Sequence, residues 1–182
     1  MKVETTPILG LITIQPEVHE DDRGYFFEAH NDLRYRLHDI GPFVQDNVSV
    51  SEFRVVRGLH YQVERPQAKL VSVLRGKIFD VAVDIRVGSP TFGKWEAVIL
   101  SESSSLQFYI PEGFAHGFMA IEEGTIVHYK CTDYYSPQNE RTINYLDPDI
   151  RITWPDHHWP MILSKKDLGG KFLRDIKDLP SF

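Results

Sequence analysis

The stretch Phe79-Asp80-Val81-Ala82-Val83-Asp84-Ile85 alternates large apolar residues with small or acidic ones. Successive side chains of a β-strand point to opposite faces of a sheet, so this period of two is typical of a strand. Similar runs, rich in β-branched and aromatic residues, occur at 8–14, 55–62, 70–74, 95–99, 106–110 and 125–132. Turn-forming pairs such as Arg75-Gly76 and Glu123-Gly124 separate them. Many short strands at this spacing predict an all-β fold of the jelly-roll kind.

Helical signals are short and lie outside these runs. Asn31 can cap a helix that ends at Gly41, and the segment Ser164-Lys165-Lys166-Asp167 has the form of a capping box. No linker, repeat or low-complexity segment divides the chain. We therefore expect one domain over residues 1–182, with a C-terminal tail from about residue 164 packed on the barrel.

The composition is that of an ordinary globular protein. The 182 residues are 42% hydrophobic and 25% charged, which allows a sizeable core. The net charge of −6 argues against non-specific nucleic-acid binding but not against a small anionic ligand. Cys131 is the single cysteine, so no internal disulfide and no cysteine-based zinc site can form. The N-terminal stretch lacks a signal-peptide pattern and no run approaches the ~20 apolar residues of a membrane span, so we expect a cytoplasmic protein.

Four clusters carry side chains suited to acid–base chemistry or anion binding. They are residues 22–28, 45–47, 57–62 with 67–70, and 110–118 with 129–132. In the third cluster His60 can act as a general base near neutral pH, although a lone histidine is more often structural. Arg57 and His60 have opposite parity on a regular strand and would face opposite ways. Gly58 between them can host a bulge that re-aims the strand, and bulges are common beside active sites.

The histidines of these clusters could instead be ligands of a metal ion. Small β-barrels of the cupin type bind metal through His-x-His, a Glu, and a later His in Pro-x-Gly-x-x-His. The later element is present from Pro111 to His116, but the first is broken because His60 is followed by Tyr61 and Gln62. A neutral glutamine is a poor substitute for imidazole, and two imidazoles are too few for a catalytic site with three protein ligands. We therefore expect no metal.

Other candidate residues each have a structural alternative. Tyr129 is either an aromatic of the barrel wall or a phenol that donates a proton to an enolate. Lys69 is either a solvated strand-edge lysine or an inward-pointing cation that stabilises an oxyanion. Asp167 is either the acidic member of the capping box or the partner that orients a histidine. Arg23 and Arg57 are either surface ion pairs or a clamp for a diphosphate.

Together and in this order, the clusters resemble the dTDP-4-dehydrorhamnose 3,5-epimerase family. The resemblance covers nearly the whole chain and rests on Asp22-Arg23-Gly24, Phe27-Glu28, Gln45-Asp46-Asn47, Arg57-Gly58-Leu59-His60 and the segments 69–71, 79–86, 89–93, 110–118, 129–130 and 134–137. It implies a cupin-like jelly-roll barrel, a homodimer, and no metal or organic cofactor. It implies dTDP-4-dehydro-6-deoxy-D-glucose as substrate and dTDP-4-dehydro-L-rhamnose, an intermediate of dTDP-rhamnose biosynthesis, as product.

The resemblance also implies a role for individual residues. His60 is the base, Asp167 is its partner in a His–Asp dyad, and Tyr129 is the acid that reprotonates the opposite face of the sugar. Lys69 lies near the keto oxygen, with His116 in the same sugar site. The residues implied to bind the nucleotide and its diphosphate are Arg23, Glu28, Gln45, Asn47 and Arg57. Glu140 and Lys166 match further binding positions.

Three rival functions stay open at this point. A relative with the same barrel motifs can epimerise only one carbon or move the keto group. A metal-dependent cupin enzyme is disfavoured by Gln62. A non-catalytic nucleotide-sugar or carbohydrate-binding jelly roll gives no reason for His60, Tyr129 and Lys69 to occur together. Spacing alone does not place Asp167 beside His60.

Overall fold

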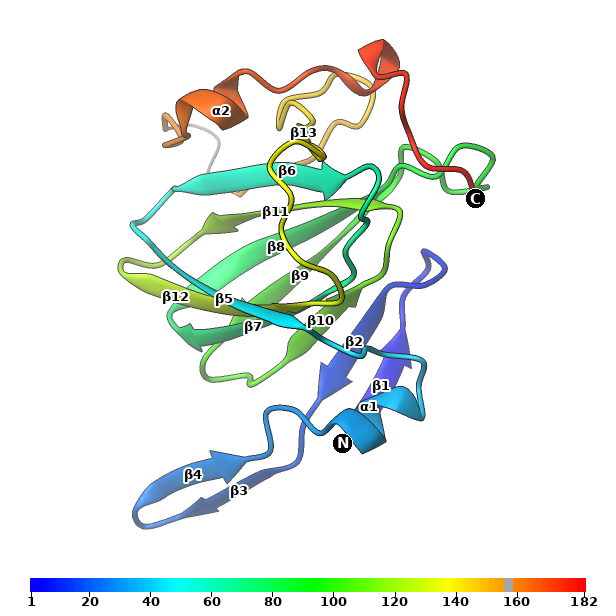
Figure 1. Ribbon diagram of the computed structural model, residues 1–182. Coiled ribbons are helices and arrows are strands. Elements are labelled where there is room, and N and C mark those ends of the chain that lie inside the picture. Colours follow the sequence, from blue (N-terminus) through cyan, green and yellow to red (C-terminus); the bar gives the residue numbers. More distant parts are fainter. Residues whose placement is uncertain (156–158) are drawn as a thin grey trace.

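Two antiparallel β-sheets packed face to face form the body of the protein (Figure 1). The computed structural model describes residues 1–155 and 159–182. The larger sheet has six strands in the order β1-β2-β10-β7-β12-β5, and the smaller has five in the order β13-β6-β11-β8-β9. The expected all-β jelly-roll fold is confirmed, and the described helices are short segments outside the sheets.

The strands of the larger sheet are β1 (Lys2–Thr5), β2 (Ile12–Gln15), β5 (Gln45–Ser51), β7 (Lys69–Arg75), β10 (Gln107–Ile110) and β12 (Thr125–Cys131). Those of the smaller sheet are β6 (Val56–Gln62), β8 (Lys77–Asp84), β9 (Trp95–Ser101), β11 (Phe114–Ala120) and β13 (Glu140–Thr142). A separate hairpin joins β3 (Val18–Asp21) to β4 (Gly24–Phe27) and projects from the body (Figure 1).

Most of the predicted strands are present with ends close to those expected. The prediction over 8–14 is wrong in its first half, because the chain makes a turn there before β2 begins at Ile12. Hydrogen bonds from Thr6 N to Leu11 O and from Leu11 N to Ile8 O close this turn, each at 3.1 Å. The backbone polar groups of the turn are thus satisfied without a neighbouring strand.

Both faces of β8 are buried. Val81 and Val83 point outward and pack beneath the C-terminal segment, in a cluster that includes Trp154. Ala82 points between the sheets into the other main cluster. Asp80, two residues earlier, shares that inner face and is completely buried. The acidic residues of the alternating stretch therefore point into the protein and not into solvent.

Both predicted helices exist, and both are short. Helix α1 (Asp32–Arg36) has Asn31 as its N-cap and Leu37 as its C-cap, so it ends ahead of the predicted stop at Gly41. Helix α2 (Lys165–Leu168) begins after Ser164, whose side chain caps it, and is followed by a 3₁₀ turn, η1 (Leu173–Asp175). Among the described residues, no helix is long and apolar enough to cross a membrane.

Candidate active site

A cavity of about 440 Å³ opens between the two sheets. Strands β6 and β11 form one wall, strands β5, β7 and β12 form the other, and α2 lies at the rim. Concave sites of this size bind small ligands. The cavity gathers most of the residues predicted from the sequence: His60, Lys69, Tyr129, Asp167, Gln45, Asn47, Arg57, His116, Glu140 and Lys166.

An irregularity at Gly58 turns both Arg57 and His60 into this cavity. On β11, His116 lies opposite His60 while Phe118 lies opposite Arg57, so the register shifts between the two pairs. Gly58 has a φ of 119°, and the Gly58–Leu59 peptide bond is cis. A Cβ at position 58 would lie 2.6 Å from the Cα of Gly117. The predicted irregularity is confirmed, and only glycine fits it.

His60 and Asp167 form a direct contact although they lie 107 positions apart. The distance from His60 Nε2 to Asp167 Oδ1 is 2.6 Å. An ionised carboxylate only accepts hydrogen bonds, so Nε2 carries the hydrogen and Nδ1 is the unprotonated nitrogen of the neutral ring. Nδ1 is therefore the atom that can accept a proton from a ligand.

Asp167 is also part of the cap of α2, so the contacts expected from both interpretations of this residue are present. Its backbone N–H donates to Ser164 Oγ at 3.1 Å, and that hydroxyl donates to Asp167 Oδ2 at 2.9 Å. Burial alone would raise the pKa of Asp167, but the hydrogen bond and charge of His60 and the bond from Ser164 outweigh it, so the pKa lies below its ordinary value. The helix cap thus holds a carboxylate that stays charged beside the imidazole.

Tyr129 and Lys69 approach from the sheet opposite His60. Burial raises the pKa of the Tyr129 phenol, with Arg57 acting weakly against it, so the phenol holds its proton. Burial lowers the pKa of Lys69, and the charges of Cys131 and Glu140 oppose that shift. Because His60 and Tyr129 belong to facing sheets, a ligand between them has an imidazole on one side and a protonated phenol on the other.

His116 forms a hydrogen bond with a buried aspartate, Asp80, which the sequence analysis did not single out as a site residue. The distance from His116 Nε2 to Asp80 Oδ1 is 2.8 Å, and both residues are buried. Burial lowers the pKa of His116 more than Asp80 raises it, so the ring is held neutral and oriented. The sequence could have indicated Asp80 as a site residue, because an aspartate inside an apolar strand is rarely buried without a partner.

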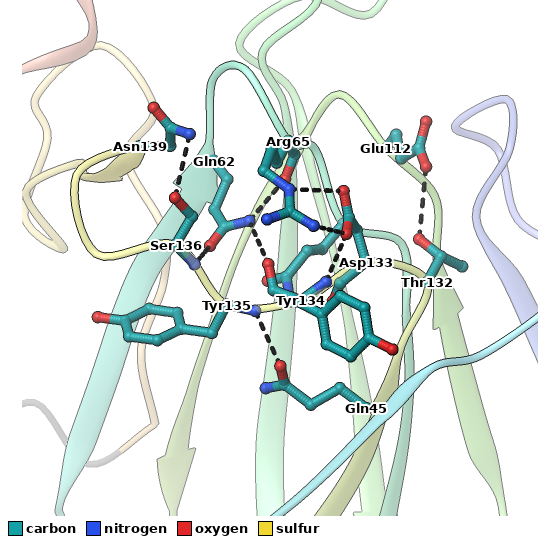
Figure 2. Close-up of polar contacts among 11 residues, drawn as sticks. Gln45, Gln62, Arg65, Glu112, Thr132, Asp133, Tyr134, Tyr135, Ser136 and Asn139 are labelled. Carbon is teal, nitrogen blue, oxygen red and sulfur yellow. Dashed lines mark hydrogen bonds and ion pairs between the residues drawn. The ribbon is translucent and has the colours of Figure 1, made fainter.

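Gln62 holds the loop that follows β12 (Figure 2). Its Nε2 donates to Arg65 O at 2.5 Å and to Tyr134 O at 3.3 Å, and its Oε1 accepts from Ser136 N at 2.7 Å. These contacts occupy the amide at the position where a metal-binding cupin has a histidine. Within residues 1–155 and 159–182, no group of three or more His, Cys, Asp or Glu side chains could hold a metal ion.

Comparison with known proteins identifies the family. The family model described as dTDP-4-dehydrorhamnose 3,5-epimerase matches residues 5–175. The chain belongs to this epimerase family. The family's enzyme from Methanothermobacter thermautotrophicus is 49% identical over 172 residues, which cover 93% of either chain.

Solved structures of epimerases share the fold across the whole chain. The enzyme from Legionella pneumophila, in complex with dTDP-4-keto-L-rhamnose, is 49% identical with a TM-score of 0.96, covering 100% of this chain and 98% of that one. A 3'-monoepimerase from Streptomyces bikiniensis, in complex with dTDP-quinovose, is 34% identical with a TM-score of 0.90, covering 97% and 91%. The fold is thus common to epimerases that differ in the carbons they invert.

Two predicted binding residues of this epimerase-family chain lie outside the cavity. Arg23 sits on the β3–β4 hairpin, with 89% of its side chain exposed, and pairs with Asp21 at 2.5 Å. Glu28 follows the hairpin and pairs with Arg34 at 3.2 Å. The hairpin extends away from β6 and α2 (Figure 1). Within one chain the structure does not bring these residues to the others, and their nucleotide-binding role stays a prediction.

The rim of the cavity contains a residue that the sequence analysis quoted only as part of a family segment. Tyr135 donates its hydroxyl hydrogen to Glu140 Oε2 at 2.5 Å. Its backbone N–H donates to Gln45 Oε1 at 2.8 Å (Figure 2). Lys166 from α2 pairs with the same Glu140 oxygen. Three separate segments therefore meet at one carboxylate beside His60.

Proposed function

We propose that this protein epimerises dTDP-4-dehydro-6-deoxy-D-glucose at both carbons flanking the ketone and releases dTDP-4-dehydro-L-rhamnose for dTDP-rhamnose biosynthesis. The observation that carries the proposal is the His60–Asp167 dyad facing Tyr129 across a cavity between two sheets. Membership of the epimerase family and the fold shared with the Legionella enzyme support it.

His60 Nδ1 removes the proton beside the ketone. The Asp167 carboxylate holds the hydrogen on Nε2 and stabilises the imidazolium that results. Tyr129 then donates its proton to the opposite face of the same carbon. A base and an acid on opposite sides invert a stereocentre, whereas one group acting alone returns the proton to the face it came from.

The enolate formed in between needs stabilisation near the ketone oxygen. We assign this to the Lys69 ammonium. The neutral His116 ring donates its N–H to Asp80 and lines the same sugar site. A fixed donor such as Lys69 contributes roughly 10²–10³ in rate. The occupied amide of Gln62 supports a mechanism with no metal ion at this position, and we propose that no organic cofactor takes part either.

The enzyme is proposed to act as a homodimer in the cytoplasm, with residues 1–182 as one domain. On the β3–β4 hairpin, Tyr25 is 59% exposed and Phe26 is 70% exposed. Aromatic side chains on a projecting arm suit insertion into a second copy. Such insertion would also bring Arg23 and Glu28 to a cavity, that of the partner. The packing of Trp154 and Leu173 against β8 supports a single domain.

Proton NMR of the substrate in heavy water with the purified protein tests the function. Deuterium at both carbons beside the ketone is the expected result. Deuterium at only one carbon would support the second candidate, a mono-epimerase, which the similarity to the Streptomyces bikiniensis enzyme favours. No deuterium at either carbon, with the nucleotide sugar bound, would overturn both and leave a binding protein.

A further inference from the structure

One imidazole that serves two carbons has to lose its first proton before it can take the second. During the first inversion the proton from carbon enters His60, and the proton delivered to the sugar leaves Tyr129. The imidazolium cannot act as a base again until it is unloaded. If the sugar stays bound between the two inversions, the proton has to leave by a route within the protein. This requirement rests on the proposed function.

Glu140 lies where such a route would begin. Strand β13 pairs with β6, and Thr142 lies opposite His60 in that register. Glu140 Oε1 is 3.9 Å from His60 Nδ1, the ring nitrogen that does not contact Asp167. A small rotation of the carboxylate, or one bridging water, brings the two atoms within hydrogen-bond reach.

The other oxygen of Glu140 leads toward the surface. Oε2 accepts the hydrogen bond from Tyr135 and pairs with Lys166. The Glu140 side chain is 11% exposed, whereas that of Lys166 is 49% exposed. The carboxylate thus connects a base inside the cavity with groups that meet solvent.

The charges around Glu140 suit a group that passes a proton on and does not retain it. Burial acts to raise the pKa of Glu140, but the hydrogen bonds from Lys166 and Tyr135 and the charge of His60 hold it below its ordinary value. Lys69 and Tyr129, on the facing sheet, are the other titratable groups whose charges couple to it. A carboxylate with a low pKa is free to accept a proton and releases it quickly.

We propose that Glu140 takes the proton from His60 Nδ1 and delivers it to the cavity rim, which resets the base between the two inversions. The N–H bond of the imidazolium breaks and an O–H bond forms on the carboxyl group. The carboxyl group then gives its proton to water beside Tyr135 and Lys166, and the Tyr129 phenolate takes a proton from solvent before the second inversion. Glu140 touches no reacting carbon in this step and acts through His60.

The test is the Glu140→Gln variant with enzyme in excess over substrate in heavy water. Glutamine keeps the size of the side chain and can accept the Tyr135 hydrogen bond, but it cannot carry a proton. Deuterium should enter one carbon at close to the wild-type rate and the second carbon roughly 10²-fold more slowly. A singly deuterated sugar should therefore accumulate. In Glu140→Ala, added formate should restore the second exchange.

Glu122→Gln is the matched control, because Glu122 pairs with Lys77 outside the cavity and should leave both exchanges unchanged. Equal rates at both carbons in Glu140→Gln and the wild type would overturn the relay and leave the epimerase intact. Loss of the first exchange too, with dTDP still bound, would also overturn it, as would a Glu140→Ala variant that formate does not rescue. No exchange in the wild type would overturn the proposed function and the relay with it.

Discussion

At the scale of single residues, Asp167 combines two roles that the sequence could only offer as alternatives. Its backbone and carboxylate complete the cap of α2, and the same carboxylate orients His60. The cap fixes Asp167 in a turn that begins at Ser164, which makes the position of the carboxylate independent of the histidine. The dyad is therefore in place before a ligand enters.

Asp167→Asn separates these roles. The backbone contact to Ser164 remains, but an amide can donate to Nε2 and so favours the tautomer with the hydrogen on Nδ1, the wrong nitrogen for a base. We expect kcat to fall by roughly 10²-fold or more with little change in melting temperature. Ser164→Ala is the comparison, because it removes the cap and spares the dyad carboxylate. A large drop in melting temperature in Asp167→Asn would instead mark Asp167 as mainly structural.

Tyr129→Phe tests the acid. The phenol keeps its proton through burial, and phenylalanine preserves the ring but has no proton to give. His60 should still remove a proton from carbon, so deuterium should exchange into the substrate with its configuration retained. Formation of the inverted product should slow by roughly 10²-fold. Unchanged rate and stereochemistry, followed by NMR, would make Tyr129 an ordinary wall residue.

Most of the site could be predicted from residue types, but its geometry could not. His60 and Asp167 are distant in sequence, and only the folding of α2 against β6 brings them together. Asp80 was visible as an aspartate in an apolar strand, yet its role depends on which face of β8 points inward. Arg23 and Glu28 matched the family and still lie outside the cavity of their own chain.

At the scale of elements, strands were predictable where one face is apolar. Strand β5 was not predicted because its polar residues face the interior and its apolar residues face outward, the reverse of the usual pattern. Gln45, Asn47 and Ser49 point into the cavity, while Val48 and Val50 point outward and are 62% and 58% exposed. The hairpin β3–β4 was missed because neither of its faces is buried, and hydrophobic periodicity reports burial.

The irregularity in β6 is an element-scale feature that can be tested by Gly58→Ala. The new Cβ would meet the backbone of β11 at 2.6 Å, and its φ is one that L-residues rarely adopt. We expect a loss of about 3 kcal/mol in the free energy of unfolding, measured by denaturant titration. Gly24→Ala is the matched control, since Gly24 has a φ of 129° but no atom within 4 Å of its Cβ position. Equal losses of unfolding free energy in the two variants would show that backbone strain, and not crowding by β11, is the reason that position 58 requires glycine.

At the scale of the whole molecule, one buried aspartate makes stability depend on acid pH. Burial would raise the pKa of Asp84, but bonds from Arg86, Ser89 and Thr91 lower it from 3.8 to about 2. A lowered folded-state pKa stabilises the native protein above the unfolded value of 3.8, and this contribution is lost as the pH falls toward about 2.

Asp84→Asn should therefore cost about 2 kcal/mol at neutral pH, since each unit of pKa shift corresponds to about 1.4 kcal/mol. The difference from the wild type should shrink between pH 4 and about 2, where both chains carry an uncharged group at this position. Denaturant titrations at several pH values measure it. A difference that is constant down to pH 2 would assign the loss to packing and not to charge.

Two exposed apolar surfaces bear on the proposed assembly of two chains. The exposed valines of β5 and the aromatic hairpin are both apolar surfaces that a second copy can cover. If the hairpin of each chain enters the cavity of its partner, each active site takes His60 from one chain and Arg23 from the other. Defects in the two residues should then complement each other.

Hybrid dimers of His60→Ala and Arg23→Ala chains, isolated by co-expression with two different affinity tags, test this arrangement. If the hairpins are exchanged, one active site of the hybrid carries both substitutions and the other carries neither. The hybrid should then show about half the wild-type activity, although each parent homodimer alone is weakly active. With hairpins that serve their own chain, each site keeps one defect and the hybrid stays as weak as the mean of its parents. Recovery from two weak parents would place Arg23 at the partner's cavity. An Arg23→Ala parent with full activity would instead return Arg23 to the role of a surface ion pair with Asp21.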